Sequence, residues 1–343
     1  MAPWALRVET VLQCNKQIGS ILFHKILLSL LLSLVLSGCA TSAQFTISDI
    51  DYFQPPIINK EFLDRQYTQF SVYKNTIKIG LGPMQSTVPS YNGQGKLFAS
   101  WTPHSAGINN RPTFVIVHGG GGVSPTDFAT AVWARKEFDA NVLVLDSYWS
   151  RGLTENQQTH TRYGANMRML DAIAAGRWLQ EQGVDTDKIF LMGGSQGGWT
   201  VIRTFTDDPW IKEQARQLYR GGISLYPNCN DKGYRDDPKL GPYWGPVLIL
   251  TAGNDDATPS SRCPRNVFTH ASSWIHYPNV THSFDIANRG ADAPSVDGEC
   301  QWARPNTIYK PFKVCRSDST TFDMHVRVKI FVNNLVNNNI MKK

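Results

Sequence analysis

The sequence of 343 residues contains no cluster of lysine and arginine, although its formal net charge is +6 at pH 7. Proteins that bind nucleic acid carry such a cluster as a basic patch, so we expect no nucleic-acid partner. The sequence also lacks a His-Glu-x-x-His motif and paired Cys-x-x-Cys motifs. Since these spacings are the usual signs of a bound metal, we expect neither a metal ion nor another cofactor.

Phosphate-binding loops are absent as well, in spite of two glycine-rich stretches at residues 118–122 and 193–198. No Gly-Lys-Ser or Gly-Lys-Thr follows the first stretch, and no Gly-x-Gly-x-x-Gly is spaced for a dinucleotide. The glycines must therefore serve a purpose other than holding the phosphates of a nucleotide.

The apolar run near the N-terminus, residues 26–36, is too short to span a bilayer and has the length of a signal-peptide core. It ends in Leu36-Ser37-Gly38-Cys39, which resembles a bacterial lipobox. We therefore predict a lipoprotein-type signal peptide over residues 1–38, lipidation of Cys39, and a tether and lead-in over residues 39–66. The alternative is an ordinary cleaved signal peptide in which the cysteine occurs by chance.

The lipobox resemblance also implies a destination. Ala40 rather than aspartate follows the cysteine, which in such signals favours sorting to the outer membrane. We expect an exported bacterial lipoprotein of the outer membrane that faces the periplasm or the cell surface and contacts the membrane through its lipid anchor.

The second glycine-rich stretch has the pattern Gly193-x-Ser195-x-Gly197 between an apolar run and a helical segment. This is the pattern of a nucleophile elbow, in which a tight strand-to-helix turn exposes a strained serine. We predict that Ser195 is a nucleophile and that the backbone N–H of Gln196 faces an oxyanion. The alternative is a glycine-rich turn with an incidental serine.

The first stretch, His118-Gly119-Gly120-Gly121-Gly122, follows an apolar run at residues 113–117 that is typical of a buried parallel strand. A glycine loop at the end of such a strand lets a backbone N–H approach a substrate carbonyl without an intervening side chain. We predict that Gly120 or Gly121 supplies the second oxyanion donor.

A serine nucleophile requires a base and an acid, and in this order of motifs they follow later strands. Asp255 and Asp256 both follow the apolar run 246–251. Asp255 is our preferred acid because it lies four residues before Pro259, and Asp256 is the alternative. His282 lies in the loop after the last predicted strand, 273–277, and is the predicted base.

Taken in this order, the motifs resemble the dienelactone hydrolase-like branch of the α/β-hydrolases over roughly residues 95–285. The resemblance implies an α/β-hydrolase fold, with a mostly parallel central sheet and helices on both faces, and a carboxylic-ester hydrolase mechanism. The namesake enzymes use a cysteine where this chain has Ser195, which favours the broader esterase-like members. The quoted motifs are Val117–Val123, Leu143–Ser147 with Arg151-Gly152, Gly194–Gly198, Asp255–Pro259, and Tyr277-Pro278 with His282–Asp285.

The alternation of apolar runs and helical patterns predicts one domain over residues 67–343. We expect antiparallel edge strands within residues 67–102, a core-facing helix over residues 164–182 and a final helix over about 321–337. Central strands are predicted near 113–117, 141–146, 188–192, 221–226, 246–251 and 273–277. The predicted inward side chains of the final helix are Phe322, Val326, Ile330 and Leu335.

Residues 286–320 form an inserted segment between the predicted base and the final helix. Its aromatic residues Trp302, Tyr309 and Phe312 favour a flap over the acyl pocket, and the alternative is a surface excursion stapled by a disulfide. Tyr148, Trp149 and Arg151 follow a strand at the same sheet edge, and we expect them to line the pocket or to pack locally.

Cysteine usage agrees with export, because four of the six cysteines lie in the mature domain and four can form two disulfides. We predict the pairs Cys229–Cys263, which join neighbouring strand ends, and Cys300–Cys315, which close a local loop. The alternative is free buried thiols.

These residues together predict a serine hydrolase that cleaves a small-molecule carboxylic ester through an acyl-enzyme. A peptidase or an acyltransferase on the same Ser-His-Asp triad is an alternative, as is a non-catalytic surface-binding lipoprotein. The sequence leaves the natural ester and the oligomeric state open.

Overall fold

The computed structural model describes residues 76–80, 96–148, 165–229, 242–263, 265–286, 297–303 and 311–337. All of them fall within one unit of the chain, Ser48–Lys343. The predicted signal peptide over residues 1–38, the lipidation site Cys39 and the tether over residues 39–66 lie outside the described residues. No helix in the described part is long and apolar enough to cross a membrane.

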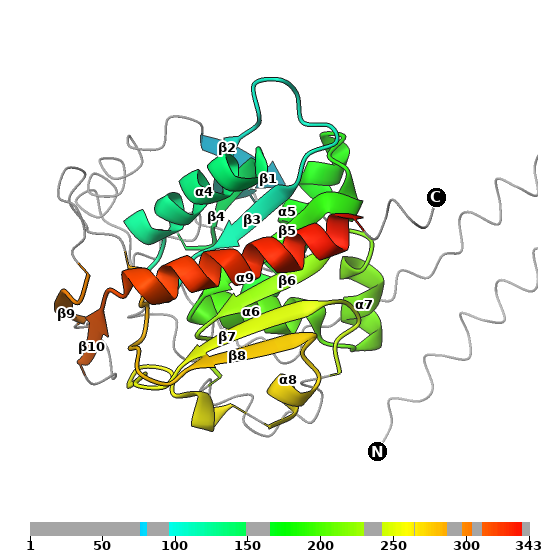
Figure 1. The fold of residues 1–343 in the computed structure, drawn as a ribbon. Helices are drawn as coiled ribbons and strands as arrows, with labels where there is room; N and C mark the ends of the chain where they lie inside the picture. Colours follow the sequence, from blue (N-terminus) through cyan, green and yellow to red (C-terminus); the bar gives the residue numbers. More distant parts are fainter. Residues whose placement is uncertain are drawn as a thin grey trace, which may run out of the picture. The chain divides into compact units, whose positions relative to one another are not determined.

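Within the described residues, eight strands form one sheet in the order β1-β2-β4-β3-β5-β6-β7-β8 (Figure 1). The strands from β4 to β8 in this order are parallel, and β2 pairs antiparallel with both β1 and β4. The strands are β1 (Thr76–Gly80), β2 (Lys96–Thr102), β3 (Thr113–Val117), β4 (Asn141–Asp146), β5 (Ile189–Gly194), β6 (Gly221–Leu225), β7 (Val247–Ala252) and β8 (Ser273–Tyr277).

Helices cover both faces of this sheet (Figure 1). Gly221 of β6 lies against Leu335 of α9, whereas the next residue, Gly222, lies against Val201 and Phe205 of α6. Because successive residues of a strand face opposite sides, α9 and α6 cover opposite faces. The helices are α4 (Pro125–Phe138), α5 (Ala165–Glu181), α6 (Gln196–Phe205), α7 (Pro209–Ala215), α8 (Arg265–Thr269) and α9 (Asp318–Asn337), with the short 3₁₀ helices η5 (Thr186–Lys188) and η6 (Ser260–Arg262).

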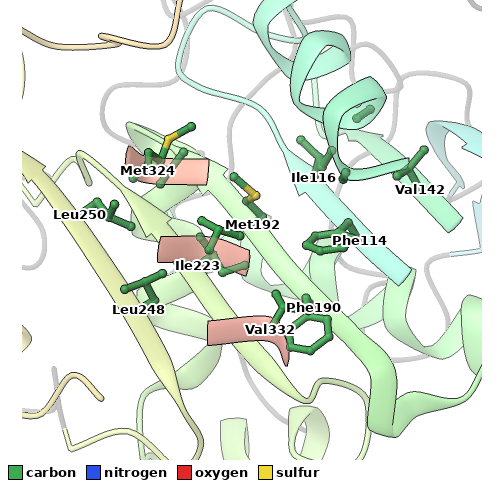
Figure 2. Packing of buried hydrophobic residues seen from close by; sticks show 14 of the residues in the cluster. Phe114, Ile116, Val142, Phe190, Met192, Ile223, Leu248, Leu250, Met324 and Val332 are labelled. Carbon is green, nitrogen blue, oxygen red and sulfur yellow. The ribbon is translucent and has the colours of Figure 1, made fainter. Parts of the chain in front are cut away.

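The core between the sheet, α4 and α9 is built from alternate side chains of the central strands (Figure 2). Every residue of β3, β4 and β7 is buried, as expected for parallel strands covered on both faces. This burial explains why these strands are continuous apolar runs in the sequence, and it confirms the predicted central strands to within two residues at either end.

The predicted helix over residues 164–182 is confirmed as α5, which is buried along most of its length. Met167 and Leu170 are each 1% exposed and Ala174 is 3% exposed. The edge strands β1 and β2 are antiparallel, as predicted for residues 67–102.

The predicted inward face of the final helix is wrong for three of its four residues. Phe322 is 70% exposed, Ile330 is 51% exposed and Val326 is only partly buried, whereas Leu335 packs against the core as predicted. The side chains that pack on the sheet are Thr321, Met324, Val328 and Val332. Met324 and Val332 point into the core in Figure 2.

Two apolar stripes of similar strength run along α9, so the helical period alone does not decide between them. The sheet decides, because Gly221 leaves room that the Phe331 and Leu335 side chains fill. This contact turns Leu335 inward and leaves Phe322 and Ile330 exposed.

Both predicted disulfides are confirmed, Cys229–Cys263 and Cys300–Cys315. The second joins β9 (Cys300–Ala303) to β10 (Phe312–Cys315), which form a separate antiparallel pair beside the N-terminal end of α9 (Figure 1). The inserted segment therefore contains ordered secondary structure of its own.

Substitutions on the two stripes of α9 should differ sharply in their effect on stability. We expect Met324→Ala to lower the free energy of unfolding by about 2–5 kcal/mol, because it leaves a cavity in the core. Phe322→Ala should change it by less than about 0.5 kcal/mol, since the ring is exposed. Equilibrium urea unfolding measures both values, and a larger loss from Phe322→Ala would contradict the observed face of the helix.

Candidate active site

Ser195 occupies the turn between β5 and α6 in a strained conformation, with φ 57° and ψ −118°. Its backbone N–H donates to the Leu225 carbonyl at 2.9 Å, and its own carbonyl accepts from the Asn228 N–H at 2.9 Å. Both partners belong to the end of β6 and the loop that follows it. The neighbouring strand therefore holds the strained residue in place.

The elbow depends on a close approach that only glycine permits. A Cβ atom on Gly197 would lie 2.2 Å from the Val117 carbonyl oxygen and 2.8 Å from that of His118. The first turn of α6 therefore packs directly on the end of β3, where the glycine-rich loop begins. This packing explains why Gly197 belongs to the motif.

The predicted oxyanion donors lie beside the serine. Ser195 and Gln196 line a cavity of about 250 Å³ together with the glycine loop, including Gly120 and Gly121. A Cβ atom on Gly119 would lie 3.8 Å from the Ser195 Cβ, which shows how closely the loop approaches the elbow. The structure thus brings two distant glycine motifs to one cavity.

Arg168 of α5 forms hydrogen bonds with residues of both motifs, and its side chain is only 1% exposed. One of its terminal nitrogens donates to the His118 carbonyl, and the other donates to Gln196 Oε1 at 3.4 Å. Tyr148 donates to Gln196 Oε1 as well, at 2.8 Å. Tyr148 therefore packs locally instead of lining the cavity, and Trp149 and Arg151 lie outside the described residues.

His118 serves as a fixed hydrogen-bonding bridge rather than as a base. Its Nε2 accepts the Ser147 backbone N–H at 3.2 Å, so its proton sits on Nδ1 and is donated to the Gly119 carbonyl at 2.6 Å. Burial lowers the pKa of His118 well below its usual value, and the positive charge of Arg168 lowers it further. The neutral ring thereby holds the start of the glycine loop.

His282 and Asp255 form a buried pair at the edge of the cavity. The His282 Nδ1 lies 2.8 Å from Asp255 Oδ2, and both side chains are almost fully buried. Asp255 Oδ1 accepts the Ala257 and Thr258 N–H groups at 2.9 and 2.6 Å. Asp256 is exposed, so the structure places Asp255 and not its neighbour against the imidazole.

The environment of Asp255 keeps its carboxylate ionised. Burial by itself raises the pKa of Asp255, but the His282 ring and the hydrogen bonds from Thr258 outweigh burial and lower the pKa below its usual value. A carboxylate on Nδ1 orients the ring and leaves Nε2 free to accept a proton.

The inserted segment supplies one wall of the cavity. Phe312 and Val314 of β10 line the cavity, and the Phe312 ring meets the His282 ring edge-on at 5.4 Å. The Cys315 N–H also donates to Thr281 Oγ1 at 2.7 Å, which ties β10 to the loop of the base. Trp302 is 62% exposed, and Tyr309 lies outside the described residues.

Strain is concentrated around this cavity. Within the described residues, five non-glycine residues have a positive φ, and three of them, Ser195, Tyr226 and Ser283, line the cavity. Such residues cluster at functional sites because the surrounding contacts must hold them there.

Sequence reasoning missed Arg168, Tyr226, Asp127 and Asp285, and only Arg168 had a visible signal. It is a lone cation in a largely apolar stretch of α5, where a charge is costly unless it has a purpose. In the described part of the chain, no group of three or more His, Cys, Asp or Glu side chains could hold a metal ion.

The chain has the α/β-hydrolase fold, as the sheet order and one solved structure similar to it agree. A sugar hydrolase from Lactococcus lactis is 14% identical, with a TM-score of 0.50 and coverage of 77% of this chain and 99% of that one. An α/β hydrolase from a Medee basin deep-sea metagenome library is 16% identical, with a TM-score of 0.49 and coverage of 77% and 98%.

A third similar structure, a puromycin-hydrolysing peptidase from Mycobacterium tuberculosis, is 18% identical with a TM-score of 0.42. The match covers 56% of this chain and 35% of the peptidase. No protein-family model and no curated protein sequence matches the chain. At 14% identity the likeness to the Lactococcus lactis structure shows the fold alone.

Adding one methyl group to the elbow should disrupt it. We expect Gly197→Ala to destabilise the protein by about 2 kcal/mol or more, because the new Cβ overlaps backbone atoms of β3 that cannot move aside. Gly121→Ala is the matched control, since a Cβ there has nothing within 4 Å. Thermal unfolding compares the two, and equal melting temperatures would contradict the packing described here.

The His282–Asp255 bond should be visible by proton NMR. We expect a downfield, exchange-protected Nδ1–H resonance that is lost in Asp255→Asn, because an asparagine amide can reverse the hydrogen bond and the tautomer. Asp256→Asn is the control and should retain the resonance. Loss of the signal from Asp256→Asn alone would show that the other aspartate holds the ring.

Proposed function

We propose that the protein is a serine hydrolase that cleaves carboxylic esters through an acyl-enzyme intermediate. The observation that carries this proposal is the convergence of three groups on one cavity. These are the strained Ser195, the glycine loop, and His282, whose Nδ1 is hydrogen-bonded to the buried carboxylate of Asp255. A binding protein has no need of a strained serine beside such a pair, so the arrangement favours catalysis.

In the proposed first half-reaction, Ser195 attacks the ester carbonyl while His282 accepts the hydroxyl proton on Nε2. Asp255 keeps the proton of the imidazole on Nδ1 and stabilises the imidazolium that forms. The backbone N–H groups of Gln196 and of Gly120 or Gly121 stabilise the oxyanion, each contributing about 10²–10³ in rate. His282 then protonates the departing alcohol.

In the second half-reaction, His282 removes a proton from water, which attacks the acyl-enzyme carbonyl and releases the acid and free Ser195. The side chains of Arg168, Tyr148 and Gln196 take part in neither step. Their hydrogen bonds hold both sides of the proposed oxyanion site in place before the substrate binds. A cavity of about 250 Å³ supports a small-molecule ester as the substrate.

We also propose that the protein acts outside the cytoplasm as a lipoprotein anchored through Cys39. Two disulfides within the hydrolase domain support export, since disulfides persist in oxidising compartments. The lipobox-like sequence at residues 36–39 supports the anchor.

Labelling with a fluorophosphonate probe tests the proposed nucleophile. We expect the wild type to be labelled, and Ser195→Ala to lose both labelling and at least about 10⁴-fold of p-nitrophenyl ester turnover. Ser261→Ala, at an exposed serine, is the matched control and should behave as the wild type. Labelling that survives Ser195→Ala would show that another residue is the nucleophile.

Two further outcomes separate the alternative functions. A p-nitroanilide of the same acyl group that is cleaved faster than the ester would favour a peptidase. A folded wild type that neither takes up the probe nor cleaves either substrate would favour a non-catalytic binding lipoprotein.

A further inference from the structure

Two carboxylates line the cavity that the proposed mechanism does not use. Asp127 comes from the first turn of α4, and Asp285 comes from the loop after His282. Among the described residues that line this cavity, none is a lysine or an arginine. The cavity thus holds two acidic groups and no lining cation beside the proposed nucleophile.

Each carboxylate accepts hydrogen bonds from neighbouring residues through only one of its two oxygens. Asp127 Oδ2 accepts both the backbone N–H and the hydroxyl of Ser124 at 2.7 Å, and Asp285 Oδ1 accepts the Tyr226 hydroxyl at 2.7 Å. The other oxygens, Asp127 Oδ1 and Asp285 Oδ2, accept no hydrogen bond from another described residue. Asp285 is nevertheless only 7% exposed. Asp127 is partly buried, and neither oxygen is a fully buried atom without a partner, so both stay available to a ligand that brings a donor.

The two groups also act on each other electrostatically. Burial raises the pKa of Asp127 to about 6, and the negative charge of Asp285 adds to the increase, while Arg168 opposes it. Burial likewise raises the pKa of Asp285, opposed by the hydrogen bond from the Tyr226 hydroxyl and by the nearby His282 and Arg316 side chains. Neither arginine is among the residues that line the cavity. A cation entering the cavity would relieve this repulsion, whereas an anion would add to it.

We propose that Asp127 and Asp285 determine substrate specificity, so that the cavity selects esters whose acyl or alcohol group carries a positively charged ammonium and rejects esters that carry a carboxylate. The inference rests on the proposed ester hydrolysis, because it concerns the same cavity. Both residues bind the non-reacting part of the substrate in this proposal, and neither takes part in proton transfer.

A purely structural role is the competing explanation, since Asp127 caps α4 through Ser124 and Asp285 orients Tyr226. Substitution by asparagine separates the two explanations. The amide oxygen of asparagine still accepts the hydrogen bonds from Ser124 and Tyr226, while the negative charge is removed.

The test compares esters that differ only in charge. One series consists of thioesters of a single acyl group. Their leaving thiol is thiocholine, its neutral 3,3-dimethylbutyl isostere or a carboxyalkyl thiol. In the other series the same three groups end the acyl chain of p-nitrophenyl esters. Values of kcat/KM are measured at pH 8, above the raised pKa of Asp127, for the wild type, Asp127→Asn, Asp285→Asn and the double variant. Asp187→Asn, an exposed aspartate in η5 at the opposite end of β5, controls for the change in net charge.

We expect the wild type and Asp187→Asn to prefer the cationic ester over its neutral isostere by about tenfold in at least one series. The anionic ester should be the poorest substrate. Each single variant should reduce the preference, and the double variant should abolish it while labelling of Ser195 by the fluorophosphonate probe persists.

A flat wild-type profile in both series, or a preference that survives in the double variant, overturns the inference and leaves the ester hydrolase in place. Should the double variant not fold, the ratios of the wild type and the single variants decide the same question. A folded wild type that cleaves no ester and takes up no probe overturns the proposed function, and the inference with it.

Discussion

The direct contact of α6 with the end of β3 is what brings Ser195 and the glycine loop to one cavity. Gly197 has no side chain, and a Cβ there would overlap the Val117 carbonyl oxygen. Helix and strand therefore pack backbone to backbone, which brings the elbow and the glycine loop to the same point. Because the strands are parallel, the loops of Ser195, Asp255 and His282 follow strand ends at one edge of the sheet.

Hydrogen bonds from neighbouring strands stabilise this arrangement against its own strain. Leu225 and Asn228 hold the backbone of Ser195, and Thr258 donates to Asp255 next to the imidazole. The inserted segment contributes in the same way, since β10 is bonded to the loop of His282 and its Phe312 covers the ring. The site is therefore prepared by the fold before any substrate binds, as electrostatic catalysis requires.

Charge is distributed unequally around the serine. The buried cation Arg168 lies behind the two oxyanion motifs, where a developing negative charge on the substrate oxygen would be stabilised. Asp127 and Asp285 line the cavity, where the rest of the proposed substrate would lie. A positive charge at one side and negative charges at the other suit an ester whose carbonyl is activated while a distant cationic group is bound.

The sequence by itself determined the motifs whose geometry is local. The turn at Ser195, the glycine loop and the buried strands follow from backbone freedom and from continuous apolar runs, and each was predicted close to its observed place. The order of serine, acid and histidine along the chain also selected Asp255 and His282, which are hydrogen-bonded, and Ser195, which lines the same cavity as His282. The reason is that the fold places successive strand ends at one edge.

Only the tertiary structure decided the choices that depend on direction. The spacing to Pro259 favoured Asp255 but left Asp256 open, and the structure places Asp255 against His282, since adjacent residues point to different sides of a loop. The inward face of α9 was decided by the room at Gly221, and the meeting of Arg168 with Gln196 by the packing of α5 on α6. Asp127 and Asp285 are far apart in the chain. They line one cavity because Asp127 follows β3 and Asp285 follows β8, and these parallel strands end at the same edge of the sheet.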